Sequence, residues 1–211
     1  MISMIRNKYL TLIGVGLLFT AVSCTDGYEP EPVELVSIDF VFSKTDSLGT
    51  NAVKFMNNIY ATLQNGHNRV GSDYLDAASD DAISINVSDP DVYKLAMGRY
   101  TASTRVESDM RWKEYYSGIR KANILINHID VVPFMLTYKN AKGLNVTMKA
   151  EARFLRAYFY FELVKRYGGV PLMGDDVHIL GDDMEIPRNT FEQCVQYICD
   201  ELDDIKDDLR T

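Results

Sequence analysis

The chain has 211 residues, of which 46% are apolar and 25% are charged, a composition typical of a folded globular protein and not of a disordered or fibrous one. The 22 basic and 30 acidic residues give a net charge of -8, and no basic cluster is present that could neutralise a phosphate backbone. We therefore expect no nucleic-acid partner.

Residues 1–23 have the features of a secretory signal. Arg6 and Lys8 precede an apolar run that is too short to span a membrane comfortably. The run ends in "AVSC", residues 21–24, which resembles the lipobox of bacterial lipoproteins. We predict a lipoprotein signal peptide over residues 1–23, with Cys24 acylated and therefore anchored in a membrane. The alternative is an ordinary cleaved signal followed by an incidental cysteine.

Residues 24–36 are predicted to form a lipidated, extended linker. Acidic residues, Gly27 and the prolines Pro30 and Pro32 favour a hydrated spacer over a helix. Removal of the signal would leave 20 basic residues against 30 acidic ones. Anionic lipid would repel such a chain, so membrane attachment would depend on the acyl groups.

Two helices are predicted in the first part of the body. In residues 48–63, Leu48, Ala52, Phe55 and Ile59 share one side, and Asn65-Gly66 ends the pattern. A second helix begins at Trp112 and ends before Pro133. Its apolar positions recur at the period of one helical face: Trp112, Tyr115, Ile119, Ala122, Ile126 and Ile129.

The stretch "KAEARFLRAYFYFELVKRYGGVPLM", residues 149–173, predicts an aromatic helix with two apolar stripes. One stripe contains Ala150, Phe154, Ala157, Phe161 and Val164, and the other contains Ala152, Phe159 and Leu163. Two stripes indicate a helix packed between two neighbours, so Phe154 and Phe161 are expected to be buried. A sugar-stacking platform is the alternative interpretation of these aromatic residues. Gly168 and Gly169, followed by Pro171, are expected to end the helix.

A fourth helix begins at a predicted capping box formed by Thr190 and Gln193. Its expected buried stripe contains Phe191, Val195, Ile198, Leu202, Ile205 and Leu209. Cys194 and Cys199 are five residues apart, point in different directions and are expected to be buried and unbridged. The fold class is therefore all-α, and helices that need neighbours on two sides favour stacked helical pairs with long loops.

Four segments, taken in order, resemble the N-terminal half of SusD/RagB-like outer-membrane lipoproteins. They are "SDYLDAASDDA", "WKEYYSGIRKANILINHID", the aromatic stretch quoted above, and "IPRNTFEQCVQYICDELDDIKDDL". The resemblance implies a tetratricopeptide-like helical scaffold over residues 37–211, which looks like the truncated N-terminal part of a larger SusD-like fold. It also implies a lipid-anchored, outward-facing outer-membrane protein that binds glycans or similar nutrients and passes them to a SusC-type TonB-dependent transporter.

Candidate ligand contacts lie in residues 86–110, between two predicted helices. Tyr93, Arg99 and Tyr100 fall outside the strong apolar stripes, and sugar sites combine exposed aromatic rings with polar groups. Local packing is the alternative role for each tyrosine. The resemblance adds that the loop before the Trp112 helix contributes to the binding surface in some family members.

No catalytic or metal-binding pattern is recognisable, so we expect no enzyme activity, no cofactor and no metal. Asp80-Asp81 is interpreted as a loop-fixing pair, and Asp175-Asp176 and Asp182-Asp183 as solvated loop acids, although calcium ligation is possible chemistry for the latter two. Asn123 is expected to hydrogen-bond a neighbouring backbone. A helical-repeat interaction scaffold without a small-molecule ligand remains the alternative function.

Overall fold

The protein is described here by a computed structural model of the following parts of the chain: residues 37–64, 69–71, 73–85, 88, 90–101, 103–104, 106, 110–135, 143–179 and 181–209. Residues 38–211 belong to one compact unit. The predicted signal peptide, linker and Cys24 lie outside the described residues. Within the described ranges, no helix has the length and apolar character needed to cross a membrane.

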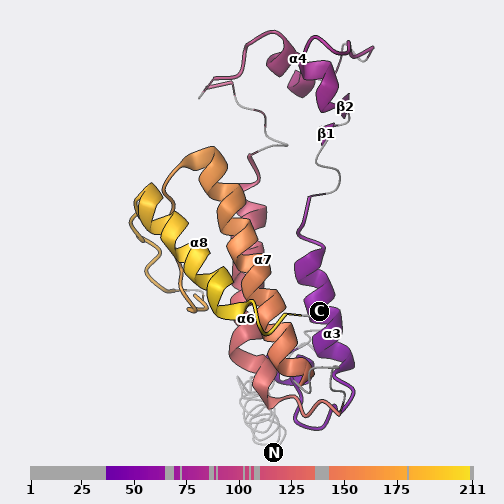
Figure 1. Ribbon diagram of the computed structural model, residues 1–211, viewed down its shortest axis with the longest axis vertical. Coiled ribbons are helices and arrows are strands. Elements are labelled where there is room, and N and C mark those ends of the chain that lie inside the picture. The colour runs from indigo at the N-terminus through magenta and orange to yellow at the C-terminus, as the bar shows by residue number, and fades with distance from the viewer. Residues whose placement is uncertain are drawn as a thin grey trace, which may run out of the picture. The chain divides into compact units, whose positions relative to one another are not determined.

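Four long helices build the main core, as the sequence pattern predicts. They are α3 (Thr50–Tyr60), α6 (Trp112–His128), α7 (Leu144–Tyr167) and α8 (Phe191–Ile205). The short helix α2 (Ile38–Val41) contacts α3, and the 3-10 turn η2 (Ile129–Val131) extends α6. Helix α7 contacts α3, α6 and α8, so it is the central helix of the group (Figure 1). The all-α fold class is confirmed.

The helix ends follow from local chemistry. Gly168 caps α7 with a φ of 70°, a left-handed conformation that favours glycine, and its N–H donates to the Val164 carbonyl. At α8, the predicted capping box is confirmed: the Gln193 N–H donates to Thr190 Oγ1, and the Thr190 N–H donates to Gln193 Oε1.

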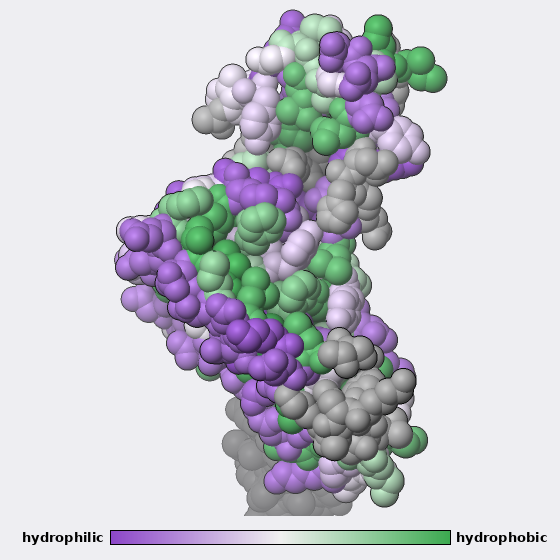
Figure 2. Space-filling model, viewed as in Figure 1, coloured by the Kyte–Doolittle hydropathy of each residue, from purple (hydrophilic) through white to green (hydrophobic). Residues whose placement is uncertain are grey.

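Helix α7 is buried on more than one side, but the prediction for two of its phenylalanines is wrong. Phe154 and Phe161 are 43% and 46% exposed, whereas Phe159 and Tyr160 are fully buried. The alanines and valine of the same stripe are buried, because α6 and α8 cover small side chains at the edge of the contact. The two larger rings project beyond that edge. Figure 2 shows apolar residues gathered on the viewed face of the helices, beside a polar strip.

The stripe predicted to be buried on helix α8 is confirmed only in part. Ile205 is buried and Ile198 packs against the core, as predicted, while Phe191, Val195 and Leu202 are exposed. Cys194 and Glu201 are the other buried residues of the helix. Glu201 is turned inward because it pairs with arginines of α7. Two further expectations are wrong: Cys199 is exposed, although Cys194 is buried as expected, and Leu48 is exposed because it precedes the first turn of α3.

Residues 69–110 contain a second, smaller apolar cluster. Two-residue strands β1 (Arg69–Val70) and β2 (Asp73–Tyr74) pair antiparallel, with Arg69 opposite Tyr74. The 3-10 helix η1 (Leu75–Ala78) follows and contacts α4 (Pro90–Ala96). The buried residues of this cluster are Val70, Ala77, Val92 and Val106. This part of the chain carries the ligand contacts predicted from the sequence.

Candidate binding site

A buried arginine connects three separate parts of the chain. Arg156 of α7 is only 1% exposed, and its Nη1 donates to Asn123 Oδ1 on α6 at 2.7 Å. The same nitrogen donates to Asp175 Oδ1 at 2.6 Å and to the Gly174 carbonyl at 3.0 Å. Its Nη2 donates to Glu201 Oε2 on α8 at 2.7 Å. Arg156 therefore holds the loop after α7 against α6 and α8.

Glu201 receives a second arginine from the same helix. Arg153 Nη2 donates to Glu201 Oε1 at 2.7 Å, and its Nε donates to Oε2 at 3.2 Å. Burial would raise the pKa of the Glu201 carboxyl, but the hydrogen bonds from Arg153 and Arg156 outweigh burial and lower this pKa. Glu201 is therefore ionised in the folded protein and balances the buried Arg156.

The lowered pKa of Glu201 predicts a loss of stability in acid. A carboxyl whose pKa is lower in the folded state stabilises the fold above its unfolded pKa of about 4.3, and this stabilisation is lost as the pH falls through the folded pKa. Urea denaturation between pH 6 and pH 3 is expected to show a shallower loss of stability in Glu201→Gln than in the unaltered chain. The exposed Glu192→Gln on the same helix is the control, and equal pH dependence in all three proteins would contradict the role given to Glu201.

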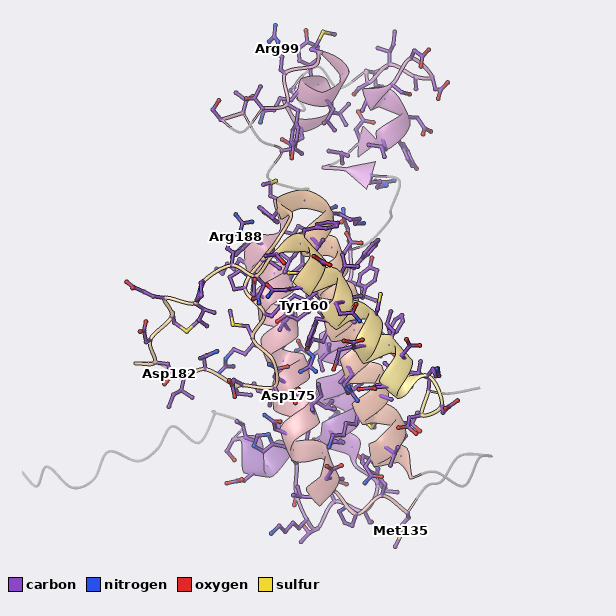
Figure 3. The ribbon with its side chains drawn as sticks, turned by 60° about the vertical axis from the view of Figure 1, so that its left-hand side comes forward. Arg99, Met135, Tyr160, Asp175, Asp182 and Arg188 are labelled. Carbon is purple, nitrogen blue, oxygen red and sulfur yellow. The ribbon has the colours of Figure 1, made fainter. Side chains whose placement is uncertain are left out.

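The loop after α7 is fixed at further points along its length. The Tyr116 hydroxyl donates to the Pro171 carbonyl at 2.8 Å, and the Met173 N–H donates to Tyr160 Oη at 2.9 Å. Asn123 Nδ2 donates to the Gly174 and Asp176 carbonyls at 3.0 and 2.8 Å, which confirms the backbone role predicted for this asparagine. Figure 3 shows Asp175 and Asp182 on this loop beside the helices, with Tyr160 among the helices.

The return of the loop to α8 is equally well defined. Arg188 donates to the Tyr167 and Gly169 carbonyls, each at 2.7 Å, and so ties the returning segment to the end of α7. A Cβ on Gly169 would lie 2.1 Å from the Asn189 carbonyl oxygen. The second glycine of the Gly168-Gly169 pair therefore permits close approach of two backbone segments, a role that helix termination alone does not require.

A cavity of about 590 Å³ lies between α6 and this loop. Its α6 side consists of Trp112, Tyr116, Ser117, Ile119, Arg120 and Asn123. Its loop side consists of Pro171, Met173, Asp176, His178, Met184 and Ile186. A concave, mostly apolar surface with a few polar groups is the usual form of a small-molecule site. We call it the α6 pocket.

Aromatic and polar side chains occupy different parts of the α6 pocket. Trp112 is 36% exposed, and its ring lies 4.8 Å from the Tyr116 ring at an interplanar angle of 44°. Burial raises the pKa of Tyr116, so its hydroxyl stays protonated and remains a donor to Pro171. Arg120 Nε donates to the His178 carbonyl at 3.3 Å, and His178 Nδ1 lies 3.7 Å from Asp182 Oδ2.

The sequence-predicted contacts Tyr93, Arg99 and Tyr100 are all exposed, and the structure brings two of them together. Arg99 lies over the Tyr93 ring, with 5.9 Å between the guanidinium carbon and the ring centroid. Tyr100 instead donates its hydroxyl to Met110 Sδ at 3.4 Å. None of the three lines the α6 pocket. The spacing of Trp112, Tyr116 and Arg120 at i, i+4 and i+8 places them on one helical face, and this spacing is the sequence signal for the α6 side of the pocket. The opposite wall is a loop, for which the sequence contains no such periodic signal.

Members of the acidic pairs contact their own loops or, in the case of Asp175, helix α7. Asp175 pairs with Arg156, Asp182 Oδ2 accepts from the Ile179 N–H, and Asp183 Oδ1 accepts from the Glu185 N–H. Asp81 accepts a long hydrogen bond from Ser79 at 3.5 Å, and its own N–H donates to the Ser79 hydroxyl. The contacts observed for these aspartates thus serve to shape loops.

Sequence comparison relates the chain to known proteins. A SusD-like family model described as "Starch-binding associating with outer membrane" matches residues 43–209. SusD-like protein P38 of Formosa agariphila is 27% identical over 208 residues, covering 97% of this chain and 37% of the relative. SusD-like protein P25 of the same organism is 25% identical over 202 residues, covering 88% of this chain and 36% of the relative.

Comparison with solved structures agrees. A SusD-like protein from Bacteroides fragilis superposes with a TM-score of 0.60 at 27% identity, covering 78% of this chain and 30% of that one. A laminarin-binding SusD-like protein superposes with a TM-score of 0.59 at 20% identity, covering 76% of this chain and 34% of that one, a likeness in fold. The helices are thus those of a SusD-like, tetratricopeptide-like scaffold, and the chain belongs to the SusD-like family. It spans just over a third of the length of the curated relatives given above.

Proposed function

We propose that the gene product carrying this chain is an outer-membrane lipoprotein that binds a glycan and passes it to a SusC-type TonB-dependent transporter. The family match over residues 43–209 is the observation that carries this proposal, because the family is described as starch-binding and associated with the outer membrane. The lipobox-like residues 21–24 supply a means of attachment. In this proposal, residues 1–23 are the signal peptide, residues 24–36 are the lipidated linker, and residues 37–211 form an N-terminal SusD-like domain that faces outward.

The proposed work of the protein is capture and hand-over, without cleavage of the glycan. Tyr93, Arg99 and Tyr100 are proposed to contact the ligand. The contact of Arg99 with Tyr93 supports this role, because it places an aromatic ring and guanidinium donors next to each other in an exposed position. An aromatic ring with guanidinium donors does not select a glycan over other ligands. The choice of a glycan therefore rests on the family.

Membrane attachment is expected to depend on Cys24. In cells that process bacterial lipoproteins, a clickable fatty acid is expected to label the unaltered protein, and Cys24→Ala is expected to lose both the label and the membrane association. Cys199→Ala is the matched control, because Cys199 is exposed in the folded protein and offers a competing thiol. Labelling and membrane retention of Cys24→Ala would disprove lipidation at this position.

Transfer of a bound glycan to a transporter predicts that the protein forms a stable complex with that transporter in the membrane. Affinity purification of the tagged gene product from its native host is expected to recover a barrel transporter, and electrophoresis through a glucan-containing gel is expected to retard the purified protein. Recovery of the transporter without any retardation by glycans would favour the alternative, a helical scaffold that has no small-molecule ligand. Failure to recover a transporter, together with no retardation in the glucan-containing gel, would contradict the proposed function.

A further inference from the structure

We infer that the α6 pocket is a binding site for a short neutral oligosaccharide, separate from the proposed ligand contacts Tyr93, Arg99 and Tyr100. The choice of a saccharide rests on the proposed function. The location of the site rests on the cavity of about 590 Å³ and on the side chains that line it.

The α6 side of the pocket presents its groups in a row. Trp112, Tyr116 and Arg120 are each four residues apart, so they lie on successive turns of one helical face. At 1.5 Å of rise per residue, the row is about 12 Å long, which exceeds the length of one pyranose ring. Tyr116 packs against the Trp112 ring, the exposed part of Trp112 can cover the apolar face of a sugar ring, and the guanidinium at the end of the row can donate to hydroxyl groups.

The polar groups of the pocket favour a neutral ligand over an acidic one. Arg120 uses its Nε on the His178 carbonyl, and no other described residue accepts a hydrogen bond from its two terminal nitrogens. Asp176, an acidic residue, also lines the pocket. A pocket that offers both a positively charged hydrogen-bond donor and a negatively charged acceptor suits hydroxyl groups, because a hydroxyl group both donates and accepts. The excess of acidic residues in the whole chain would further repel an anionic polysaccharide.

The loop wall of the pocket is held in place before any ligand arrives. The Tyr116 hydroxyl holds Pro171, Tyr160 holds Met173, and Asn123 holds the carbonyl of Asp176. Asn123 is itself fixed by the buried Arg156. A fixed wall reduces the entropy lost on binding, which favours a built site over an incidental gap between side chains.

Trp112 makes the inference directly testable, because it is the only tryptophan in the 211 residues. The full chain is titrated with maltoheptaose, laminariheptaose and, as the acidic comparison, an oligogalacturonide, while tryptophan fluorescence is recorded. A saturable change is expected with at least one neutral glucan and not with the oligogalacturonide. Arg120→Ala is expected to weaken the affinity about tenfold or more, as loss of a charged hydrogen-bond donor does.

Lys113→Ala is the matched control, because it removes an exposed positive charge from the same helix outside the pocket. Equal effects of Arg120→Ala and Lys113→Ala, a response only to the acidic sugar, or no response at all would overturn the inference. Retardation of the gene product in a glucan gel, with no change in Trp112 fluorescence, would overturn this site and leave the proposed function standing. Absence of both the retardation and the fluorescence change would overturn both proposals.

Discussion

Arg156→Met is expected to lower the free energy of unfolding by about 3 to 5 kcal/mol, because removal of one partner from a buried ion pair leaves the other charge uncompensated. Methionine keeps much of the side-chain volume, so the loss reports on the charge and its hydrogen bonds. The substitution releases Asn123, the Gly174 carbonyl and Asp175, and leaves Glu201 with Arg153 alone. Urea denaturation followed by circular dichroism measures the effect.

Lys149→Met is the matched control for this substitution. Lys149 lies on the same helix and pairs with Asp130 at 2.6 Å, but both side chains are exposed to solvent. Surface pairs of this kind contribute about 0 to 1 kcal/mol, so this control is expected to have little effect. The double variant Arg156→Met/Glu201→Gln is expected to lose less stability than the sum of the two single variants. A similar, small effect of Arg156→Met and Lys149→Met would contradict the role of the network.

Phe159→Ala is expected to cost about 3 to 5 kcal/mol, the usual range for removal of a large aromatic side chain from a core. The Phe159 ring is fully buried and lies 6.0 Å from the Tyr115 ring of α6, centroid to centroid. Gly118 of α6 allows this approach, because a Cβ there would lie 2.7 Å from the Phe159 ring. The melting temperature and the urea midpoint should both fall.

Phe161→Ala provides a control of the same residue type two positions along the same helix. Its ring is about half exposed and carries the ammonium of Lys165 at 4.8 Å from its centroid, a contact worth about 0.5 to 1 kcal/mol at exposed sites. The loss of stability in Phe161→Ala is therefore expected to be clearly smaller than in Phe159→Ala. The reverse order would show that the wrong face of α7 has been assigned to the core.

These two phenylalanines show how far the sequence predicts the fold. Helical periodicity correctly predicts four long helices and a central α7 with neighbours on two sides. Helical periodicity cannot show how much of the circumference of α7 is buried, because the buried part depends on how far α6 and α8 extend around α7. Phe154 and Phe161 share a stripe with buried alanines, yet they lie at the edge of the contact and project from it.

Charged residues limited the prediction in a different way. Glu201 is not part of the buried stripe predicted for the last helix, but it points inward to Arg153 and Arg156. That pairing joins residues more than 40 positions apart, and no spacing rule within one helix reveals it. The α6 pocket cannot be predicted from the sequence for the same reason. Its α6 side follows helical spacing, but its other wall is an irregular loop. The path of that loop is set by hydrogen bonds from Arg156 and Asn123.

Isothermal titration calorimetry of the gene product against a panel of polysaccharides, with parallel measurement of released reducing ends, tests the proposed function most directly. The proposal that this SusD-like protein captures a glycan without cleaving it predicts saturable heat with at least one polysaccharide and no increase in reducing ends over time. Absence of binding heat across the panel, or release of reducing ends by the purified protein, would contradict it.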